Sequence, residues 1–386
     1  MIYILKQAFK YDLKKDYTVR PYRQGDEEDI VQLLQLVFNG WPHLDLKCSS
    51  LDFWRWKYQD KVLDRKIISV AEINNKIIGS THPRPLKIKI FDKILLCSLG
   101  GDVAVHLDFR NIGVWKKLRK FSNEAKKKAG VQYSYLVTGN PIVIKGFMRS
   151  KNYNLFPISL VNLVRIKDID QQLQMMSVKN SLLKKLGFHA AKILNDIANT
   201  IRGSESVKQD LTIAETDNFD ERINGFWEEV SNQYDFIVER RRDYLNWRYC
   251  DPRCGDFIIK IAEYEGQILG YSVLRINRYL RDYPVGYIVD LLTLPSRPDV
   301  SEALAADAVS YFDSNDVNII NYQVVKGHPY EQILKKQGFL NSRIKIHIFY
   351  NPLGNKDEIR KLKTSPENRI YVSWGDHDVL PVRIPT

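Results

Sequence analysis

The apolar positions near the start of the chain follow two different spacings, which predict different elements. Two apolar runs, Ile67 to Ile73 and Lys76 to Ser80, flank an Asn-Asn pair, and this arrangement predicts a β-hairpin. The run Tyr17 to Arg20 predicts a strand. Between them, apolar residues from Ile30 to Phe38 recur at helical spacing behind an acidic stretch, so a helix is expected there.

A later stretch passes from a strand through a turn into a helix. The alternation from Asp102 to Leu107 suits a strand that is covered on both faces. The helix that follows carries one apolar stripe, which ends near Gly130: Val114, Leu118, Phe121, Ala125 and Ala129. In the turn, Arg110 to Gly113, the glycine permits close approach of a ligand, and the first free N–H groups of the helix face outward. Such a turn favours a pyrophosphate.

The same order of segments occurs twice. Four pairs of segments correspond, the first two at a separation of 191 residues and the last two at 188: Phe53–Tyr58 with Tyr244–Tyr249, Val70–Gly79 with Ile261–Gly270, Asp102–His106 with Asp290–Leu294, and Gly139–Pro141 with Gly327–Pro329. The chain is therefore predicted to hold two copies of one fold. The tryptophans Trp54, Trp56 and Trp247 recur with the hairpin, so we expect them in the core.

The second copy differs from the first at the turn. It has Pro295 to Ser301, with two prolines and no glycine, where the first copy has its glycine-containing turn. Proline removes N–H donors, and the lack of glycine prevents close approach of a phosphate. Phosphate binding is therefore expected in the first copy alone.

Composition narrows the class of protein. The chain has 386 residues, 44% of them hydrophobic, which is enough for two domains, and no apolar run is long enough to span a bilayer. Its four cysteines are too few and too scattered for a disulfide framework, so a cytoplasmic location is expected, and the spacing of Cys250 and Cys254 does not suit a metal site. The net charge of +12 indicates an anionic partner, but no motif for specific nucleic-acid recognition is present.

The turn and the repeat resemble the GNAT (GCN5-related N-acetyltransferase) superfamily, whose cofactor loop reads Q/R-x-x-G-x-G/A. Arg110, Gly113 and Trp115 fall on the first, fourth and sixth places, and Trp115 departs from the usual small residue. The resemblance implies an α/β fold of two GNAT-like domains in tandem, each a mostly antiparallel twisted sheet with a splayed parallel strand pair, flanked by helices. The expected boundaries are an N-terminal domain over 1–167, a helical linker over 168–209, a degenerate second domain over 210–353 and a tail over 354–386.

The resemblance also implies an acyl-CoA site in the first domain. Pantetheine would lie along Val103 and Val105, and the pyrophosphate would sit on the backbone of the turn. The implied contacts are Val103, Val105, Arg110, Asn111, Ile112, Gly113, Val114, Trp115 and Asn140, with Lys116, Lys117, Arg119 and Lys120 near the 3′-phosphate. Trp115 could crowd the pyrophosphate or stack beside the pantetheine.

Three residues are candidates for the general base: Asp102, His106 and Glu72. Of these residue types, only histidine has an unperturbed pKa near neutrality. Asp102 and Glu72 recur in the second copy as Asp290 and Glu263, which favours structural roles for both. The tyrosine that often serves as the acid in the family is replaced by Phe147 in the first copy and by Ile333 in the second.

The segments outside the two copies leave alternatives open. The connection from Asp168 to Gln209 has an apolar helical face with lysines nearby, which suits a helix packed between domains or, alternatively, a helix at a membrane surface. In the tail, Asp376, His377 and Asp378 could line a substrate site or bind a metal, although we expect them to form a solvated turn after an edge strand.

The sequence thus predicts an acyl-CoA-dependent N-acyltransferase, using acetyl-CoA or another acyl-CoA as co-substrate and acting on a small-molecule amine or an amino sugar. The suggestion of an amino-sugar acceptor rests only on a likeness of the tail to GNAT-like proteins that are encoded with surface-polysaccharide enzymes. Two alternatives are a Fem-type aminoacyl-tRNA-dependent transferase and a non-catalytic acyl-CoA-binding or scaffold protein. The sequence does not identify the acceptor or the oligomeric state.

Overall fold

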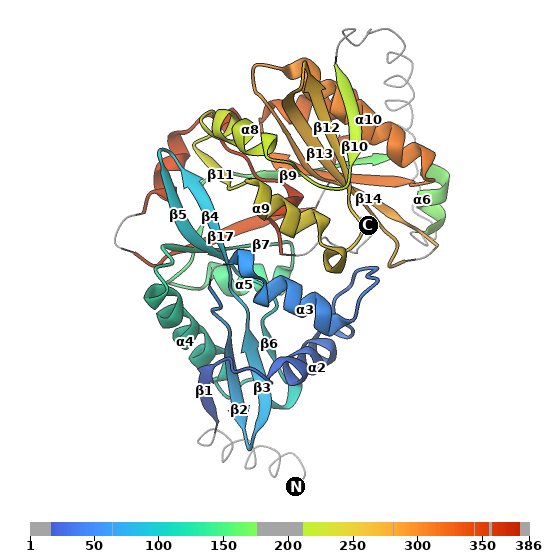
Figure 1. The fold of residues 1–386 in the computed structure, drawn as a ribbon. Helices are drawn as coiled ribbons and strands as arrows, with labels where there is room; N and C mark the ends of the chain where they lie inside the picture. The colour runs from blue at the N-terminus through green and yellow to red at the C-terminus, as the bar shows by residue number, and fades with distance from the viewer. Residues whose placement is uncertain are drawn as a thin grey trace.

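Three hydrogen-bonded sheets organise the protein in a computed structural model, which describes residues 17–63, 65–175, 211–280, 282–342, 344–354 and 357–378. Figure 1 shows a small sheet near the N-terminus, a second sheet in the middle and a third in the C-terminal part. The predicted connecting helix with its apolar face, from Leu183 to Ile201, lies outside the described residues.

The first sheet is four-stranded and contains the predicted hairpin. Its strands, in spatial order, are β1 (Thr18–Pro21), β2 (Ser69–Ile73), β3 (Lys76–Thr81) and β6 (Ala104–Val105). Helices α2 (Glu27–Phe38), α3 (Ser50–Gln59) and α4 (Val114–Lys128) flank it. Asn74 and Asn75, with φ of 49° and 61°, form the turn between β2 and β3, as the Asn-Asn pair predicts.

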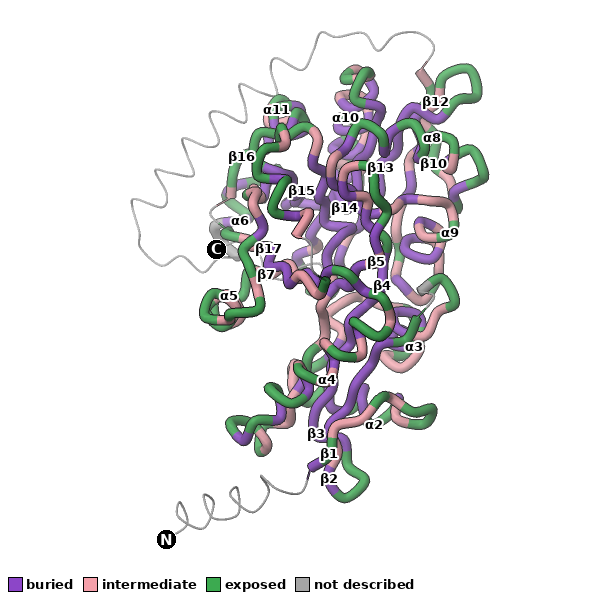
Figure 2. Tube along the Cα trace, turned by 90° about the vertical axis from the view of Figure 1, so that its left-hand side faces the viewer, coloured by how far each residue is buried: buried purple, intermediate pink, exposed green. Residues whose placement is uncertain are grey.

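The second sheet is six-stranded. In spatial order it contains β11 (Phe236–Val238), β4 (Arg84–Ile90), β5 (Lys93–Leu99), β7 (Tyr133–Thr138), β17 (His347–Pro352) and β8 (Asn154–Leu155). Strands β5 and β7 are parallel, and their pairing ends at Leu99 and Tyr135. Helix α5 (Pro141–Met148) follows β7 and has no buried residue, although its sequence is largely apolar; Figure 2 shows it projecting from the body of the protein.

The third sheet is seven-stranded and carries the largest hydrophobic core. In spatial order it contains β10 (Thr212–Thr216), β12 (Ile258–Tyr264), β13 (Gln267–Asn277), β14 (Val285–Thr293), β15 (Ile319–Val325), β9 (Leu160–Ile166) and β16 (Leu340–Asn341). The helices in this part of the chain are α6 (Ile169–Met175), α8 (Arg222–Ser231), α9 (Arg242–Leu245), α10 (Pro298–Ser314) and α11 (Pro329–Lys336). Strands β14 and β15 are parallel.

These sheets confirm the predicted fold class, an α/β fold with mixed, mostly antiparallel sheets flanked by helices and one parallel strand pair in each half. We call residues 17–156 the N-terminal unit and 211–342 the C-terminal unit. Two strands outside these units, β9 and β17, each follow one unit along the chain and join the sheet of the other. β9 follows the N-terminal unit along the chain but pairs with β15, whereas β17 follows the C-terminal unit but pairs with β7.

Two details of the strand-turn-helix stretch differ from prediction. The strand is shorter than Asp102 to Leu107, because Asp102 adopts a left-handed φ of 44° and Leu107–Phe109 form a 3₁₀ turn, so only Ala104 and Val105 pair with β3. Along α4, Val114 and Leu118 of the predicted stripe are buried, but Phe121 is only partly buried.

Two tryptophans join the units. The rings of Trp56 and Trp247 stack with centroids 5.2 Å apart, and each indole N–H donates to the other residue's carbonyl, at 2.8 and 3.2 Å. Trp54, Trp56 and Trp247 are all buried, which confirms their predicted core positions.

This pair predicts coupling between the units. We expect Trp56→Phe and Trp247→Phe each to lower the free energy of unfolding by about 1–2 kcal/mol, since each removes one buried hydrogen bond and part of the ring stack. The double variant should lose less than the sum of the single variants by roughly 1 kcal/mol, because both changes remove the same contact. Urea unfolding of the four proteins measures this coupling, and strictly additive losses would contradict it.

Candidate functional site

The turn before α4 has the backbone geometry of an anion site. Asn111 and Gly113 both adopt left-handed φ, 68° and 94°. Gly113 is the N-cap of α4 and provides no side-chain hydrogen bond to the helix, so the N–H groups of the first turn keep their donor capacity. The Arg110 Nε donates to the carbonyl of Val105 at 3.4 Å, which fixes the turn against β6. Ile112 and Val114 are buried beneath the turn, and Trp115 is 38% exposed beside it.

The strand beside this turn, β6, is an edge strand of its sheet. Its free edge faces the space where β5 and β7 part, and we call this space the gap. Gly100 N donates to the carbonyl of Tyr135 at 2.7 Å, and no further pairing joins the described residues of the two parallel strands beyond it. On the other side, β6 pairs with β3, and His106 N donates to Ile78 at 2.9 Å. Because bonding alternates along an antiparallel strand, the N–H groups of Val103 and Val105 point away from β3, toward the gap.

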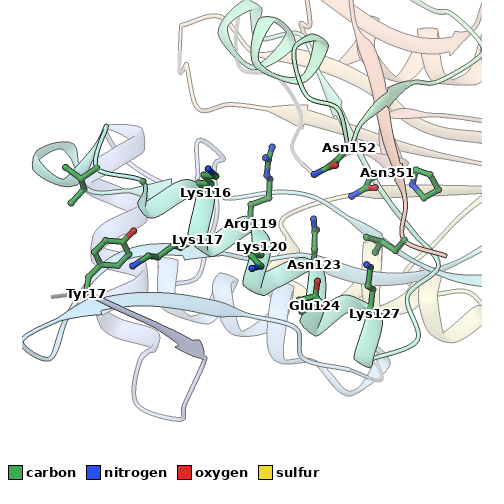
Figure 3. Close-up of a pocket in the computed structure, with 14 residues that line it drawn as sticks. Tyr17, Lys116, Lys117, Arg119, Lys120, Asn123, Glu124, Lys127, Asn152 and Asn351 are labelled. Carbon is green, nitrogen blue, oxygen red and sulfur yellow. The ribbon is translucent and has the colours of Figure 1, made fainter. Parts of the chain in front are cut away.

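A cationic cavity lies along α4. Its volume is about 760 Å³, and Ile112 and Gly113 line one end. Five cations of α4 contribute to its wall, against the single carboxylate of Glu124: Lys116, Lys117, Arg119, Lys120 and Lys127. Figure 3 shows these side chains along one face of the helix, with Asn152 and Asn351 across the cavity. The predicted phosphate turn and the predicted cations therefore open onto one space.

Asp102 lies at the break between β5 and β6, where it accepts three side-chain hydrogen bonds. They come from Trp41 Nε1 at 2.9 Å, Lys57 Nζ at 2.7 Å and Tyr58 Oη at 2.5 Å. Burial alone would raise the pKa of Asp102, but Lys57 and the bonds from Lys57 and Tyr58 outweigh it, so the pKa lies below its usual value. Asp102 is therefore a charged and well-satisfied carboxylate.

The other two base candidates have separate surroundings. His106 caps the 3₁₀ turn by accepting from Asp108 N at 3.3 Å, and its ring packs on Phe109. Glu72 lies on β2 and pairs with Arg20 at 2.6 Å, a partner that lowers its pKa. Among the described residues, no hydrogen bond or ion pair joins the side chains of His106, Glu72 and Asp102 to one another.

Asn140 is the N-cap of α5, and Phe147 lies within this helix. The side-chain oxygen of Asn140 caps this helix by accepting from Ile142 N at 3.0 Å and Val143 N at 3.4 Å, so this oxygen already has partners. The ring of Phe147 contacts Tyr153 and Phe349, with centroids 4.5 and 5.6 Å away.

The tail contradicts the expected solvated turn. Asp376 and His377 are 3% and 4% exposed, and Asp378 forms an ion pair with Lys57 at 3.0 Å, so the tail runs between the two units. Sequence analysis missed Lys57 as a site residue. Its counterpart in the second copy is Arg248, and only this shared positive charge could have pointed to it.

In the C-terminal unit, side chains fill the corresponding gap. The hydroxyl of Tyr371 accepts from Leu291 N at 3.1 Å and donates to the carbonyl of Leu291 at 2.7 Å. Thr293 N donates to the Tyr330 hydroxyl at 2.9 Å. The N-cap of α10 is Arg297, followed by Pro298, which has no N–H. Backbone donors of β14 are therefore already used inside the protein.

Residues 18–156 match the profile of a family described as "Acetyltransferase (GNAT) domain". No curated protein matches the sequence. Among solved structures, a probable N-acyltransferase of unknown function from Enterococcus faecalis V583 has 14% identity and a TM-score of 0.59, covering 87% of this chain and 72% of its own. A GCN5-related N-acetyltransferase from Anabaena variabilis has 12% identity and a TM-score of 0.57, covering 88% and 73%.

A third similar structure is the N-myristoyltransferase of Saccharomyces cerevisiae with bound myristoyl-CoA and inhibitors. It has 9% identity and a TM-score of 0.57, covering 88% of this chain and 80% of its own. At these identities the likeness concerns the fold. In the described residues, no helix is long and apolar enough to cross a membrane.

Proposed function

We propose that this chain, whose residues 18–156 match a GNAT acetyltransferase domain, is an acyltransferase of the GNAT superfamily that binds acyl-CoA in its N-terminal unit alone and transfers the acyl group to a primary amine. The observation that carries this proposal is the difference between the two gaps. In the N-terminal unit the N–H groups of Val103 and Val105 face the gap, whereas Tyr371 and Tyr330 occupy the matching positions in the C-terminal unit. Acetyl-CoA is the proposed donor, and a small-molecule amine or an amino sugar is the proposed acceptor.

Each part of the cofactor has a proposed partner. Pantetheine would bond to the backbone of Val103 and Val105, like an added strand. The pyrophosphate would accept from the N–H groups of Asn111 to Trp115, with Arg110 holding the turn in place. Lys116 and Lys120 are one turn apart on α4 and would meet the 3′-phosphate. Asn140, whose oxygen caps α5, keeps its amide N–H₂ as a contact.

Acyl transfer needs a polarised thioester carbonyl and a neutral amine. An N–H of β6 near Val105 would donate to the carbonyl oxygen. Phe147 offers no proton to the leaving thiolate, but a thiol with an ordinary pKa of about 8.5 can leave without help. The bases predicted from the sequence, Asp102, His106 and Glu72, stay proposals.

A non-catalytic acyl-CoA-binding protein is the second candidate. Phe147, in place of the family's usual tyrosine, and the bulky Trp115 beside the turn favour it. The Fem-type alternative would use tRNA as donor, and the turn from Arg110 to Gly113 argues for CoA instead. We also propose that the units arose by duplication, because Tyr58 bonds to Asp102 as Tyr249 bonds to Asp290, and that the protein is cytoplasmic.

Trp115 provides a direct test of CoA binding. It is 38% exposed, whereas the other six tryptophans are buried, so CoA at the turn should change the fluorescence of this one residue. We expect a saturable change below about 1 mM CoA, which Trp115→Phe abolishes, and release of free thiol from acetyl-CoA when an amine is added.

The charges of α4 provide a matched control. The double variant Lys116→Glu and Lys120→Glu should weaken CoA binding by about 10-fold or more, because both cations line the cavity. Lys76→Glu with Lys87→Glu changes the net charge equally at exposed positions outside this cavity and should leave binding within about 2-fold. No CoA binding, or equal losses in both double variants, would refute the proposed site. CoA binding without thiol release from any amine would favour the second candidate.

A further inference from the structure

The tail places one carboxylate in each unit, and each carboxylate shares a cation with an aspartate of that unit. In the C-terminal unit, Arg240 bonds to Asp290 at 3.0 Å and to Asp376 at 2.9 Å. In the N-terminal unit, Lys57 bonds to Asp102 at 2.7 Å and to Asp378 at 3.0 Å. Asp290 and Asp102 occupy corresponding places in the repeat.

The two tail carboxylates differ in how far their hydrogen-bonding capacity is used. Both oxygens of Asp376 accept from Arg240 Nη2, at 2.9 and 3.0 Å, and Oδ2 also accepts from Ser373 N at 2.9 Å. Asp378 Oδ1 binds Lys57, but Oδ2 has no hydrogen-bond partner in the described part of the chain. The Asp378 side chain is 13% exposed, compared with 3% for Asp376.

Asp378 also lies at the end of the proposed pantetheine path. A Cβ on Gly101 would come within 2.1 Å of Asp378 Oδ2, so the carboxylate rests directly on the backbone of Gly101. Gly101 is two residues before Val103, at the break between β5 and β6 where the parallel strands part. A thioester held at Val103 to Val105 would bring its carbonyl carbon toward this carboxylate.

A buried cation with unused donors, Arg84, faces the same place. Arg84 is 1% exposed, and its Nε and Nη1 have no hydrogen-bond partner among the described residues, while its Nη2 donates weakly to the carbonyl of His377 at 3.4 Å. The charged and titratable groups around Asp378 are Lys57 and Tyr58 from α3, Arg84 from β4, Asp102 from the strand break and His377 from the tail. Burial, together with the neighbouring Asp102 carboxylate, raises the pKa of Asp378 more than Lys57 and Arg84 lower it, whereas the pKa of Asp102 is lowered.

We propose that Asp378 is the catalytic residue that binds and deprotonates the acceptor amine, so that the tail completes the active site of the N-terminal unit. The inference rests on the proposed function. The acceptor ammonium gives one proton to the Asp378 carboxylate, and the freed electron pair on nitrogen attacks the thioester carbonyl. The C–N bond forms, the C–S bond breaks, and the sulfur takes up a second proton from nitrogen to become the free thiol. Asp378 then releases its proton to water.

Asp376 makes a matched control possible. Asp378→Asn leaves Lys57 paired with Asp102, and Asp376→Asn leaves Arg240 paired with Asp290, so both variants remove one of two carboxylates from a shared cation. Thiol release from acetyl-CoA is measured with glucosamine and spermidine as probe amines, alongside CoA binding by Trp115 fluorescence and thermal unfolding. We expect Asp378→Asn to lower kcat by about 100-fold and to remove the ascending limb of the pH–rate profile, while CoA affinity stays within about 2-fold.

The outcomes separate this inference from the proposed function. Asp376→Asn should lower the melting temperature and keep the shape of the pH–rate profile. The inference is overturned if Asp378→Asn keeps more than about half of kcat, or if its only effect is the loss of melting temperature seen with Asp376→Asn. The inference is also overturned if the wild type binds CoA but releases no thiol with either amine. An absence of CoA binding would refute the proposed function itself.

Discussion

Acidification from about pH 7.5 to about pH 4.5 is expected to remove most of the stability of the folded protein, because three buried histidines resist protonation. Burial lowers the pKa of His82 and of His328 to about 4, and burial together with the nearby Arg248 lowers that of His377 to about 3. Their Nε2 atoms are buried and have no hydrogen-bond partner in the part of the chain that the structure describes. A proton at Nε2 would therefore add an unsatisfied donor and a buried charge.

The direction in which the free energy of unfolding changes with pH follows from which state binds more protons. An unfolded histidine has a pKa near 6.5, so between about pH 6.5 and pH 4 the unfolded chain binds up to three protons that the folded protein does not. Stability is fully present above about pH 6.5 and is lost as the pH falls toward 4, by roughly 2.5 kcal/mol for each histidine at pH 4.5. The raised pKa values of Asp376 and Asp378 act in the opposite direction, since the folded state takes up their protons first.

Urea unfolding at several pH values measures this loss. His328→Asn should remove one of the protons that the unfolded chain takes up and the folded protein does not. The slope of the free energy of unfolding against pH should then fall by about 1.4 kcal/mol per pH unit. Asn is a suitable replacement because Asn140 caps α5 as His328 caps α11. His43→Gln, at a partly exposed position, is the control for the loss of a histidine as such. A stability that stays constant between about pH 6.5 and pH 4.5 would contradict the prediction.

Local patterns predicted the elements that local chemistry determines. The hairpin of β2 and β3, the helix α2 behind its acidic first turn and the helix α4 after Gly113 all lie where apolar spacing placed them. In each case neighbouring residues carry the signal: the Asn-Asn turn, the acidic first turn or the left-handed glycine. The turn from Arg110 to Gly113 has left-handed residues, Asn111 and Gly113, for the same reason, and phosphate binding there stays a prediction.

The exchange of strands could not be predicted in this way. β9 and β17 are both short apolar strands, and their residues do not indicate which sheet each joins. The partner is set by pairing with β15 in one case and β7 in the other, residues far away along the chain. The predicted domain boundaries, at residues 167 and 353, stay a prediction. The hydrogen bonds of β9 and β17 join each of these strands to the sheet of the other unit.

The buried tail escaped prediction for a related reason. Asp376, His377 and Asp378 form a polar run, and a polar run is usually solvated. They are buried because Arg240 and Lys57, from distant segments, supply the opposite charge. One of the three candidate bases named from the sequence, Asp102, was therefore found without Asp378, the carboxylate that shares its cation.

Replacement of Arg240 by methionine should destabilise the protein by about 3–5 kcal/mol, because it leaves two carboxylates buried without their cation. Arg240 is 2% exposed, and it bonds to Asp290, Asp376 and the carbonyl of Val238. Chemical denaturation measures the loss, and Arg240→Met combined with Asp376→Asn should recover part of it, since one uncompensated charge is gone.

An ion pair with a partly exposed cation supplies the comparison for this prediction. Arg369 is 42% exposed and pairs with Asp235 at 2.8 Å, so Arg369→Met should cost at most about 1 kcal/mol. If Arg240→Met cost no more than this, the buried cation would not hold the tail, and the position of Asp378 would need another cause. If the predicted loss is found, the charge that anchors Asp376 in the C-terminal unit also fixes the chain two residues before Asp378. The C-terminal unit, where Asp376 is fully bonded, would then position Asp378, the carboxylate proposed to act in the active site of the N-terminal unit.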